Sequence, residues 1–495
     1  MIPAIYLEAF VLTLGILLLL VEAFSGKEDK TPLAWMGIAG LGVVFILTFF
    51  TANDPTSQAE AAYWGFYQAD FKALFFKRFA LLTTIVVLIM AIEYKGVVQK
   101  YIFGSKPQAG LGEFYALPIL TCAGLMWMAS AVDFIMIFVS LELVTISFYI
   151  LVAYMRRNTR SLEAGVKYLI LSALSTGFFV YGITWVFGVT GHTNLGQIAA
   201  ALPHLRAARG ALMFGFMLVL VGLGFKIAAA PFQLWVPDVY QGAPTPVTAF
   251  LSVGSKAAGF IVLMRVLEVF LSVPWMVRKV TTVIVALAAL SLLYGNLAAM
   301  PQLNLKRLMA YSSIAHAGYL LIAVACIGEG GGAELAISFY LAGYLLMTLL
   351  TFLVMIVVAN HSEGDDIHHF NGLSKRSPYL AFGMLVAMAS LAGIPLTVGF
   401  FGKFLVFYVA YERGQFLLIG LGVITVAAGF YYYLKVVQAM YWREASDKTP
   451  IRMAPLTKGT IAALAFCIFL FGVYPAPIMR ALEPPPPDTP RMAAR

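Results

Sequence analysis

Long apolar runs separated by short polar segments dominate this sequence. A backbone inside hydrocarbon must satisfy its own hydrogen bonds, and these runs do not show the alternation of barrel strands. The pattern predicts an all-α polytopic membrane protein of about 14 transmembrane helices. The runs lie near residues 4–24, 33–50, 74–94, 113–130, 132–154, 162–190, 210–232, 244–270, 276–299, 304–327, 333–358, 379–410, 415–440 and 455–475.

Composition supports this interpretation. Of the 495 residues, 61% are hydrophobic and 12% are charged, whereas roughly a quarter of a typical soluble domain is charged. Fourteen spans of about 20–23 residues use about 280–320 residues, which matches the apolar content. A soluble enzyme, a disordered chain and a nucleic-acid binder are therefore excluded. The net charge of +9 needs no anionic partner, because basic loops orient membrane proteins.

Loop charges predict an orientation. With the N-terminus outside, the inner loops carry 16 Lys and Arg residues and the outer side carries 11. This bias favours both termini on the outer side, which is periplasmic in a bacterial inner membrane. The N-terminus lacks a basic segment, so the first run is expected to be a retained span rather than a cleaved signal peptide. Prolines 484–487 predict a flexible or extended end.

Cysteine usage gives no sign of a metal or cofactor. Cys122, Cys326 and Cys467 lie inside apolar runs without metal-ligand spacing, so we expect small core residues. No flavin, nucleotide or cluster motif is present. The prediction is that this chain holds no metal and no cofactor.

Ionisable residues inside the apolar runs are the candidate functional residues. A charge in the middle of a membrane costs at least about 2.5–3.5 kcal/mol, so such groups should face the interior and mark an ion path. For any single one, a snorkelling side chain or a structural ion pair is the alternative, above all for Arg265. The predicted proton relay comprises Glu142, Lys167, Lys226, Lys256, His316, Lys403 and Lys435.

Glycine and proline accompany two of these lysines. Lys226 lies within the Gly- and Pro-containing segment 222–231, and Lys403 ends a similar segment, 393–403. Such residues interrupt helices and free backbone carbonyls, and transporters place ion sites at discontinuous helices. The pattern predicts two discontinuous helices beside an ion path, although a proline kink that serves packing is the alternative.

Residue spacing predicts an internal repeat. Glu142 precedes Lys226 by 84 residues, and His316 precedes Lys403 by 87. Five helices per repeat, an odd number, would invert the second copy in the membrane. The predicted division is an N-terminal three-helix segment (1–112), a first five-helix repeat with a proton half-channel (113–270), a second inverted repeat (271–440), and a C-terminal helix with a tail (441–495).

Lysine, glutamate and histidine suit proton transfer. Burial destabilises a charged lysine while a nearby carboxylate stabilises it, so a Glu–Lys pair that opens and closes can toggle the proton. Arginine never deprotonates and cannot do this. An unperturbed histidine titrates near neutral pH and suits a relay. Hydroxyl stripes beside Lys256 and His316 suggest a wet interior, although hydroxyls also hold helices together.

Six motifs carry a family resemblance over nearly the whole chain. They resemble the antiporter-like membrane subunits of respiratory complex I, and Gly393–Pro395 followed by Lys403 is similar to the N-type branch. The motifs are Ser140–Leu143, Glu163–Tyr168, Phe225–Phe232, Trp235–Tyr240, Gly242–Pro246 and Tyr311–Tyr319.

The resemblance implies roles for the buried residues. Glu142 and Lys226 would form the coupling pair of the first half-channel, and Lys256 would be the connecting residue. His316 would lie near the path toward the second half, and Lys403 would be the terminal proton carrier. The implied activity is proton translocation coupled to quinone reduction in other subunits of an NADH:quinone oxidoreductase.

The resemblance also implies partners. Lys167 matches an additional lysine of the N-type branch. FMN, iron–sulfur clusters and quinone would belong to other subunits, and the neighbours would be membrane subunits M and K, with lipid, protons and water. A subunit of a cation/proton antiporter, a membrane-bound hydrogenase-type complex, or a scaffold stabilised by buried charges are the alternatives. The proton exit side, Na⁺ involvement, the quinone type and direct pumping against electrostatic relay stay open.

Overall fold

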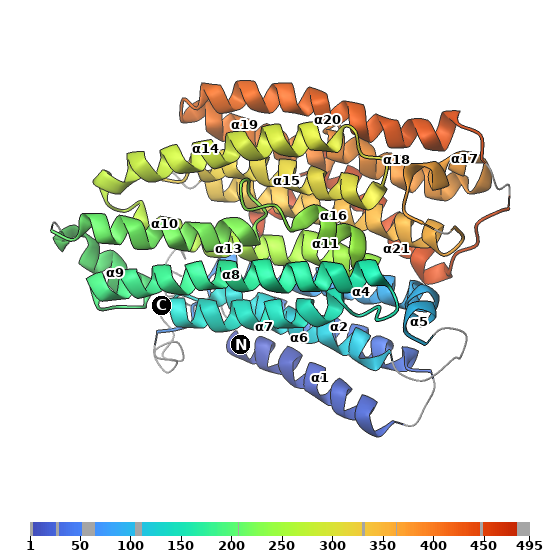
Figure 1. The fold of residues 1–495 in the computed structure, drawn as a ribbon, viewed down its shortest axis with the longest axis horizontal. Helices are drawn as coiled ribbons and strands as arrows, with labels where there is room; N and C mark the ends of the chain where they lie inside the picture. The colour runs from blue at the N-terminus through green and yellow to red at the C-terminus, as the bar shows by residue number, and fades with distance from the viewer. Residues whose placement is uncertain are drawn as a thin grey trace, which may run out of the picture.

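Helices make up almost all of the chain that the structure describes. The structure is a computed structural model, and it describes residues 3–25, 29–51, 65–103, 111–205, 207–328, 332–362, 364–445 and 449–482. Prolines 484–487 and loop residues such as Lys27 and Lys106 lie outside this part. Most helices lie side by side along the long direction of Figure 1, with α1 at the lower edge and α20 at the upper edge.

The order of the main helices follows the apolar runs. They are α1 (Ile5–Phe24), α2 (Thr31–Leu47), α4 (Phe71–Glu93), α5 (Lys95–Phe103), α6 (Gly112–Ser130), α7 (Phe134–Val152), α8 (Thr159–Thr190), α10 (Arg209–Lys226), α11 (Val236–Gly242), α12 (Thr245–Phe250), α13 (Lys256–Phe270), α14 (Pro274–Ala299), α15 (Leu305–Val324), α16 (Gly332–Ala359), α18 (Pro378–Ala392), α19 (Val398–Glu412), α20 (Phe416–Trp442) and α21 (Pro455–Val473).

Twelve helical segments of the described chain are long and apolar enough to cross a membrane. Two of the fourteen expected runs differ. The run near 304–327 forms α15, whose hydroxyls, histidine and basic residues lower its hydropathy. The run near 379–410 is divided into α18 and α19, each of 15 residues. The prediction of a multi-pass, all-helical membrane protein is confirmed, whereas the number of fourteen spans stays a prediction.

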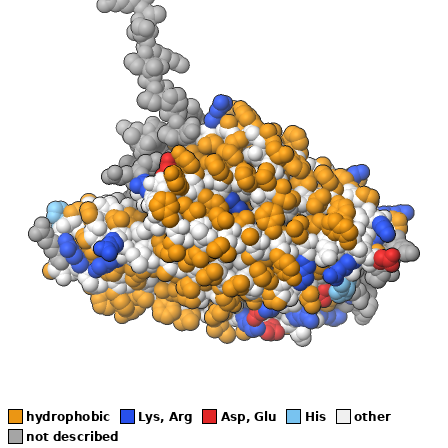
Figure 2. Space-filling view, turned by 90° about the horizontal axis from the view of Figure 1, so that it is seen from above, with side chains coloured by type: hydrophobic (Ala, Val, Ile, Leu, Met, Phe, Trp, Pro, Cys, Tyr) orange, Lys and Arg blue, Asp and Glu red, His pale blue; other side chains and the backbone are white. Residues whose placement is uncertain are grey.

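Burial separates the helices into a core and a periphery. The segment Thr245–Phe270 is buried throughout and α16 nearly so, whereas less than a third of the spanning part of α1 or α8 is buried. Hydrophobic side chains cover the middle of the face drawn in Figure 2, and charged side chains gather toward its two ends. That distribution is typical of a protein with an apolar belt for lipid or neighbouring membrane subunits.

Both predicted helix interruptions occur. α10 ends at Lys226, and a non-helical segment precedes α11. α18 ends before Gly393, which has a φ of 91° that favours glycine, and α19 begins at Val398. Each break lies beside a buried lysine, Lys226 at the first and Lys403 at the second.

Candidate functional site

Lys256 is buried at the centre of the molecule. It follows directly on the π-helical turn η3 (Leu251–Ser255), a deformation that often marks functional sites. Its Nζ donates to the Ser313 backbone carbonyl at 2.6 Å and also contacts Ser313 Oγ. The Nζ lies 5.3 Å from the centre of the Tyr344 ring. Neutral oxygens and an aromatic face therefore surround this ammonium group.

His316 lies on α15 within a cluster of buried tyrosines. Its Nδ1 is 2.7 Å from the Tyr340 hydroxyl, and its Nε2 is 3.1 Å from the Tyr433 hydroxyl. The Tyr344 ring centre lies 5.0 Å from the imidazole centre. A neutral imidazole has one donor and one acceptor nitrogen, and each tyrosine hydroxyl can serve either. The imidazole can therefore accept a proton at one nitrogen from one tyrosine hydroxyl while it releases its other proton at the second nitrogen to the other hydroxyl.

Lys403 occupies the break between α18 and α19. Its Nζ donates to the Leu391 carbonyl at 2.8 Å and to the Ala392 carbonyl at 2.9 Å. These carbonyls are free because α18 ends there, and a helix C-terminus carries a partial negative charge. The Nζ also lies 5.1 Å from the centre of the Tyr319 ring. Tyr319 is on α15, one turn after His316, so the two groups share one protein interior.

Glu142 and Lys226 do not form a direct ion pair in the described chain. Lys226 Nζ donates to Thr145 Oγ1 at 2.9 Å, and Glu142 accepts from Thr176 Oγ1 at 3.0 Å. A cavity of about 10 Å³ lies between α7, α8 and α10, lined by Ser172, Thr176 and Lys226 among others. This volume holds about one water molecule. Thr176, which donates to Glu142, therefore lines the same small cavity as Lys226.

Two lysines of the predicted relay have a different setting. Lys167 is 42% exposed and pairs with Glu163 at 2.6 Å and with Asp238 at 2.7 Å. Lys435 is half-buried, and its Nζ donates to the Gln302 carbonyl at 3.0 Å just beyond the end of α14. Neither lysine joins the buried group around Lys256 and His316.

Sequence reasoning missed the tyrosines of the cluster. Tyr340, Tyr344 and Tyr433 lie within expected apolar runs and were given no role, although each is almost fully buried. A buried tyrosine hydroxyl normally needs a hydrogen-bond partner. The signal available in sequence was the placement of Tyr340 and Tyr344 one helical turn apart, but their partners come from other helices.

Two buried cations were also missed. Lys77 was assigned to an outer loop, yet it forms a 2.8 Å ion pair with Glu8 in which both side chains are fully buried. Lys306 was assigned to an inner loop, yet it is buried beside Asp365 at 3.2 Å. Both lysines lie within two turns of a helix start, where sequence alone does not distinguish a loop-facing side chain from a core-facing one. These two lysines therefore do not belong among the loop charges, and the orientation of the chain stays a prediction.

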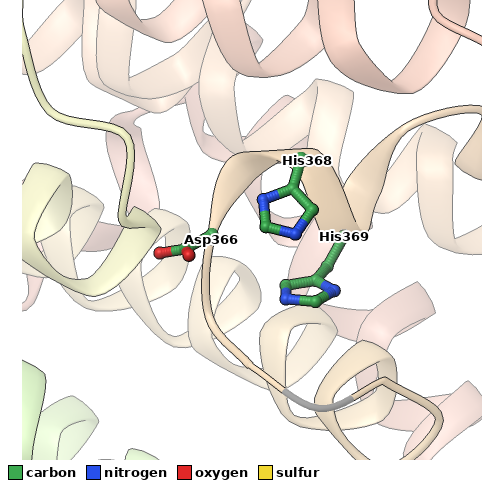
Figure 3. A group of neighbouring side chains, drawn as sticks. All are labelled: Asp366, His368 and His369. Carbon is green, nitrogen blue, oxygen red and sulfur yellow. The ribbon is translucent and has the colours of Figure 1, made fainter.

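A group of polar side chains at one end of the molecule could hold a metal ion. Ligand atoms of Asp366, His368 and His369 lie within 4.8 Å of one another, and Figure 3 shows them together. The two histidine rings are 4.0 Å apart, and Asp366 Oδ1 accepts from Asn304 Nδ2 at 2.9 Å. Burial, together with the neighbouring His368, lowers the pKa of His369. These contacts fix the loop that follows α16.

Comparisons with known proteins agree on one family. A family model described as the transmembrane region of NADH:quinone oxidoreductase and Mrp antiporter proteins matches residues 131–429. "NADH-quinone oxidoreductase subunit N 2" of Chloroherpeton thalassium is 36% identical over 481 residues, covering 95% of this chain and 92% of that protein. "NADH-quinone oxidoreductase subunit N" of Trichlorobacter lovleyi is 39% identical over 446 residues, covering 89% and 88%.

Solved structures give the same result. A chain of respiratory complex I from Thermus thermophilus with bound aureothin is 32% identical, with a TM-score of 0.79 and coverage of 96% of this chain and 99% of that chain. A chain of an archaeal membrane-bound sulfane sulfur reductase shares the fold at 23% identity, with a TM-score of 0.83 and coverage of 97% and 96%. The resemblance inferred from the six motifs is confirmed. The chain therefore belongs to the NADH:quinone oxidoreductase/Mrp antiporter family of membrane subunits, and the two relatives described above are named as N subunits.

Proposed function

We propose that this chain is a proton-translocating membrane subunit of an NADH:quinone oxidoreductase. The observation that carries the proposal is the buried polar group that runs from Lys256 through Ser313 and His316 to Lys403. Groups that can change protonation are costly in a membrane interior and mark ion paths. The names of the relatives supply the driving reaction, which is quinone reduction by NADH.

Each relay residue has a role that its contacts support. Glu142 would tune Lys226 across the water-sized cavity, and Lys256 would receive the proton from the first half. His316 and its tyrosines would connect Lys256 with Lys403, which holds a proton beside the carbonyls that end α18. Lysine fits these positions because it can lose its charge, which arginine cannot do.

Lys167 and Lys435 would be the outer members of the relay. Both are partly exposed, so they can exchange protons with water more readily than the buried lysines. Lys167 is bound by two carboxylates, and Lys435 is bound by carbonyls at the end of α14. A structural role for either residue is the alternative.

The proposed architecture has fourteen spans in two inverted repeats. The first repeat (113–270) would comprise α6, α7, α8, the α10–α11 pair and the α12–α13 pair. The second (271–440) would comprise α14, α15, α16, the α18–α19 pair and α20. The support is that the broken helix is fourth in each set. With segments 1–112 and 441–495 added, the even number of spans would place both termini on the same side of the membrane, and the basic loops favour the periplasmic side of a bacterial inner membrane.

The proposal assigns redox chemistry to other subunits. FMN, iron–sulfur clusters and quinone would be bound there, and membrane subunits M and K would be the neighbours of this chain. A cation/proton antiporter subunit is the second candidate, because a chain of the Mrp complex from Dietzia has the same fold with a TM-score of 0.79. That likeness is at 19% identity and concerns the fold alone.

The test compares buried and exposed lysine replacements in the assembled complex. Membrane vesicles carrying Lys256→Met or Lys403→Met should show at least a tenfold lower NADH-driven proton uptake, with normal amounts of assembled complex. Lys279→Met, at an exposed position of α14, is the matched control and should leave uptake unchanged. Normal uptake in both buried variants would refute the relay, and uptake that follows a Na⁺ gradient without NADH would favour the antiporter.

A further inference from the structure

Three side chains of types that bind metal ions lie together on one turn after α16. The turn is the 3₁₀ segment η4 (Ile367–Phe370), and Asp366 is the residue that precedes it. Ligand atoms of Asp366, His368 and His369 all lie within 4.8 Å of one another. Figure 3 shows the two imidazole rings side by side on this turn. The proposed proton relay uses none of these three residues.

The short turn brings the three groups together. Side chains three residues apart eclipse in a 3₁₀-helix, and the His369 backbone N–H donates to the Asp366 carbonyl at 3.0 Å. His369 therefore lies on the same side of the turn as Asp366, and the centre of the His368 ring is 4.0 Å from that of His369. Asp366 occupies the N-cap position, but its carboxylate makes no capping hydrogen bond to the turn. The carboxylate thus remains available to a ligand.

The ring nitrogens of His368 and His369 make no hydrogen bond within the part of the chain that the structure describes. Other histidines differ, because His316 uses both ring nitrogens and His361 Nδ1 lies 3.0 Å from the Val357 carbonyl. Burial and the neighbouring His368 lower the pKa of His369, so its ring is neutral near pH 7. A neutral imidazole is the form that binds a metal. Both histidines therefore offer nitrogen ligands.

Asn304 orients the carboxylate from the neighbouring loop. Its Nδ2 donates to Asp366 Oδ1 at 2.9 Å, and its Oδ1 accepts the Arg307 backbone N–H at 3.1 Å as the N-cap of α15. The backbones of Asn304 and Asp366 also form an antiparallel bridge. Such outer hydrogen bonds are typical of metal-binding carboxylates. The adjacent Asp365 is paired with Lys306 at 3.2 Å, so Asp366 is the carboxylate left for a cation.

We propose that Asp366, His368 and His369 bind a divalent transition-metal ion, with Zn²⁺ as the expected occupant, and that the ion fastens turn η4 to the start of α15. Two imidazoles and one carboxylate form a ligand set that suits Zn²⁺, with water in the fourth position. Mg²⁺ and Ca²⁺ prefer oxygen ligands alone. This proposal departs from the expectation, drawn from the cysteines, that the chain holds no metal.

The ligand atoms must move closer together to hold the ion. Zinc bonds to nitrogen and oxygen of about 2.0–2.2 Å place tetrahedral ligand atoms about 3.3–3.6 Å apart. Side-chain rotation supplies the difference, because His368 is exposed and Asp366 and His369 are half-buried. An ion can reach the cluster through solvent, since Asp366 also lines a polar cavity of about 990 Å³.

Metal binding would order the start of α15. The ligand Asp366 is joined to α15 by one hydrogen bond from the N-cap residue, Asn304. An ion that binds only the folded arrangement stabilises it by mass action. The site does not depend on the proposed relay, because its ligands and its readout, metal binding, are separate from proton transfer.

The first experiment counts Zn²⁺ on the purified, assembled complex after treatment with a chelator. Equilibrium binding of radioactive Zn²⁺ should show one more tight site in the native complex than in the double variant His368→Gln/His369→Gln. Asp366→Asn should weaken that site at least tenfold. Zinc sites elsewhere in the complex are common to all forms and cancel in the difference. Equal counts in the native complex and the double variant would mean adventitious zinc only and would overturn the site.

His192→Gln is the matched control and should bind Zn²⁺ as the native complex does. His192 is an exposed histidine just beyond the end of α8. The other end of α8 carries Arg160, which lines the same cavity as Asp366. The 32 residues of this helix extend about 48 Å at 1.5 Å per residue, so the control lies far from the cluster. Loss of the tight site in the control would contradict the assignment to these three residues.

The second experiment identifies the ligands. X-ray absorption at one equivalent of Zn²⁺ should show nitrogen and oxygen neighbours at about 2.0–2.2 Å, whereas sulfur neighbours at about 2.3 Å would place the ion at cysteines and overturn the site. Displacement of Zn²⁺ by a small excess of Mg²⁺ would also contradict imidazole ligands. Asn304→Ser keeps an N-cap residue but removes the donor to Asp366, so it should weaken Zn²⁺ binding about 10–100-fold.

Hydrogen exchange tests the link to α15. Zn²⁺ should slow backbone exchange at residues 305–309 and 366–371 of the native complex and should leave both segments of the double variant unchanged. Slower exchange confined to residues 366–371 would overturn the fastening of α15. The double variant should retain native NADH-driven proton uptake, since none of its changed residues belongs to the relay. Failure of the relay variants would leave these binding results unchanged, so the two proposals are tested separately.

Discussion

The buried lysines differ in what surrounds their ammonium groups. Lys256 and Lys403 contact neutral carbonyl oxygens and aromatic rings. Lys77 and Lys306 instead contact a carboxylate. A neutral setting offers less to hold the charge, so the proton of Lys256 or Lys403 can leave at a smaller cost. A carboxylate partner stabilises the charged form of the lysine, which suits a structural ion pair.

The Glu8–Lys77 pair provides a test at this scale. Lys77→Met alone should destabilise the folded chain by about 3–5 kcal/mol, because it leaves the Glu8 carboxylate buried without its partner. The double variant Glu8→Leu/Lys77→Met should recover most of that loss, since both charges are removed together. Thermal unfolding of the purified complex measures both. A double variant as unstable as the single one would contradict the pairing, because the Tyr67 hydroxyl contact would then dominate.

Helix breaks are the elements that matter most for the site. Both were predicted, because the glycine and proline residues in segments 222–231 and 393–403 interrupt helices. The lysine contacts at each break were not predictable. Lys226 meets a hydroxyl of α7, while Lys403 meets carbonyls of the preceding helix half. Such a choice depends on the distance between helices, which sequence spacing does not contain.

A glycine at the second break should be indispensable. A Cβ at Gly399 would lie 1.9 Å from the Ser390 carbonyl oxygen, so Gly399→Ala must push α19 away from α18. We expect little assembled complex in the membrane, measured by native gel and quinone reduction. Gly420→Ala is the control, because no atom lies within 4 Å of a Cβ there and alanine favours a helix by about 1 kcal/mol. Equal assembly of the two variants would show that the break is not rigid.

At the scale of the whole molecule, one cation ties three regions together. Lys72 on α4 lies 3.0 Å from Glu268 of α13 and 2.6 Å from Glu334 of α16. These helices belong to the N-terminal segment and to the two proposed repeats. The sequence predicted the membrane class and nearly all helices, because apolar length is a local property. It did not predict this tie or the tyrosine cluster around His316, because both join side chains separated by many residues.

Removing that tie should loosen the ends of two helices. Lys72→Met leaves Glu268 and Glu334 facing each other, so hydrogen exchange should rise at the end of α13 and the start of α16. The expected loss of stability is about 1 kcal/mol, because the pairs are partly exposed and screened. Lys279→Met on α14 should change neither measurement. If hydrogen exchange rose only in other helices, the Lys72 ion pairs would not be what holds the end of α13 and the start of α16.

Lys403 of α19 binds the end of α18 through its ammonium group. Its ammonium group lies on the last carbonyls of α18, which carry the negative end of that helix dipole. A neutral amine is held there less firmly, because the attraction between a full charge and the dipole is lost. Loss of the Lys403 proton would therefore weaken the contact between the end of α18 and α19, and return of the proton would restore it.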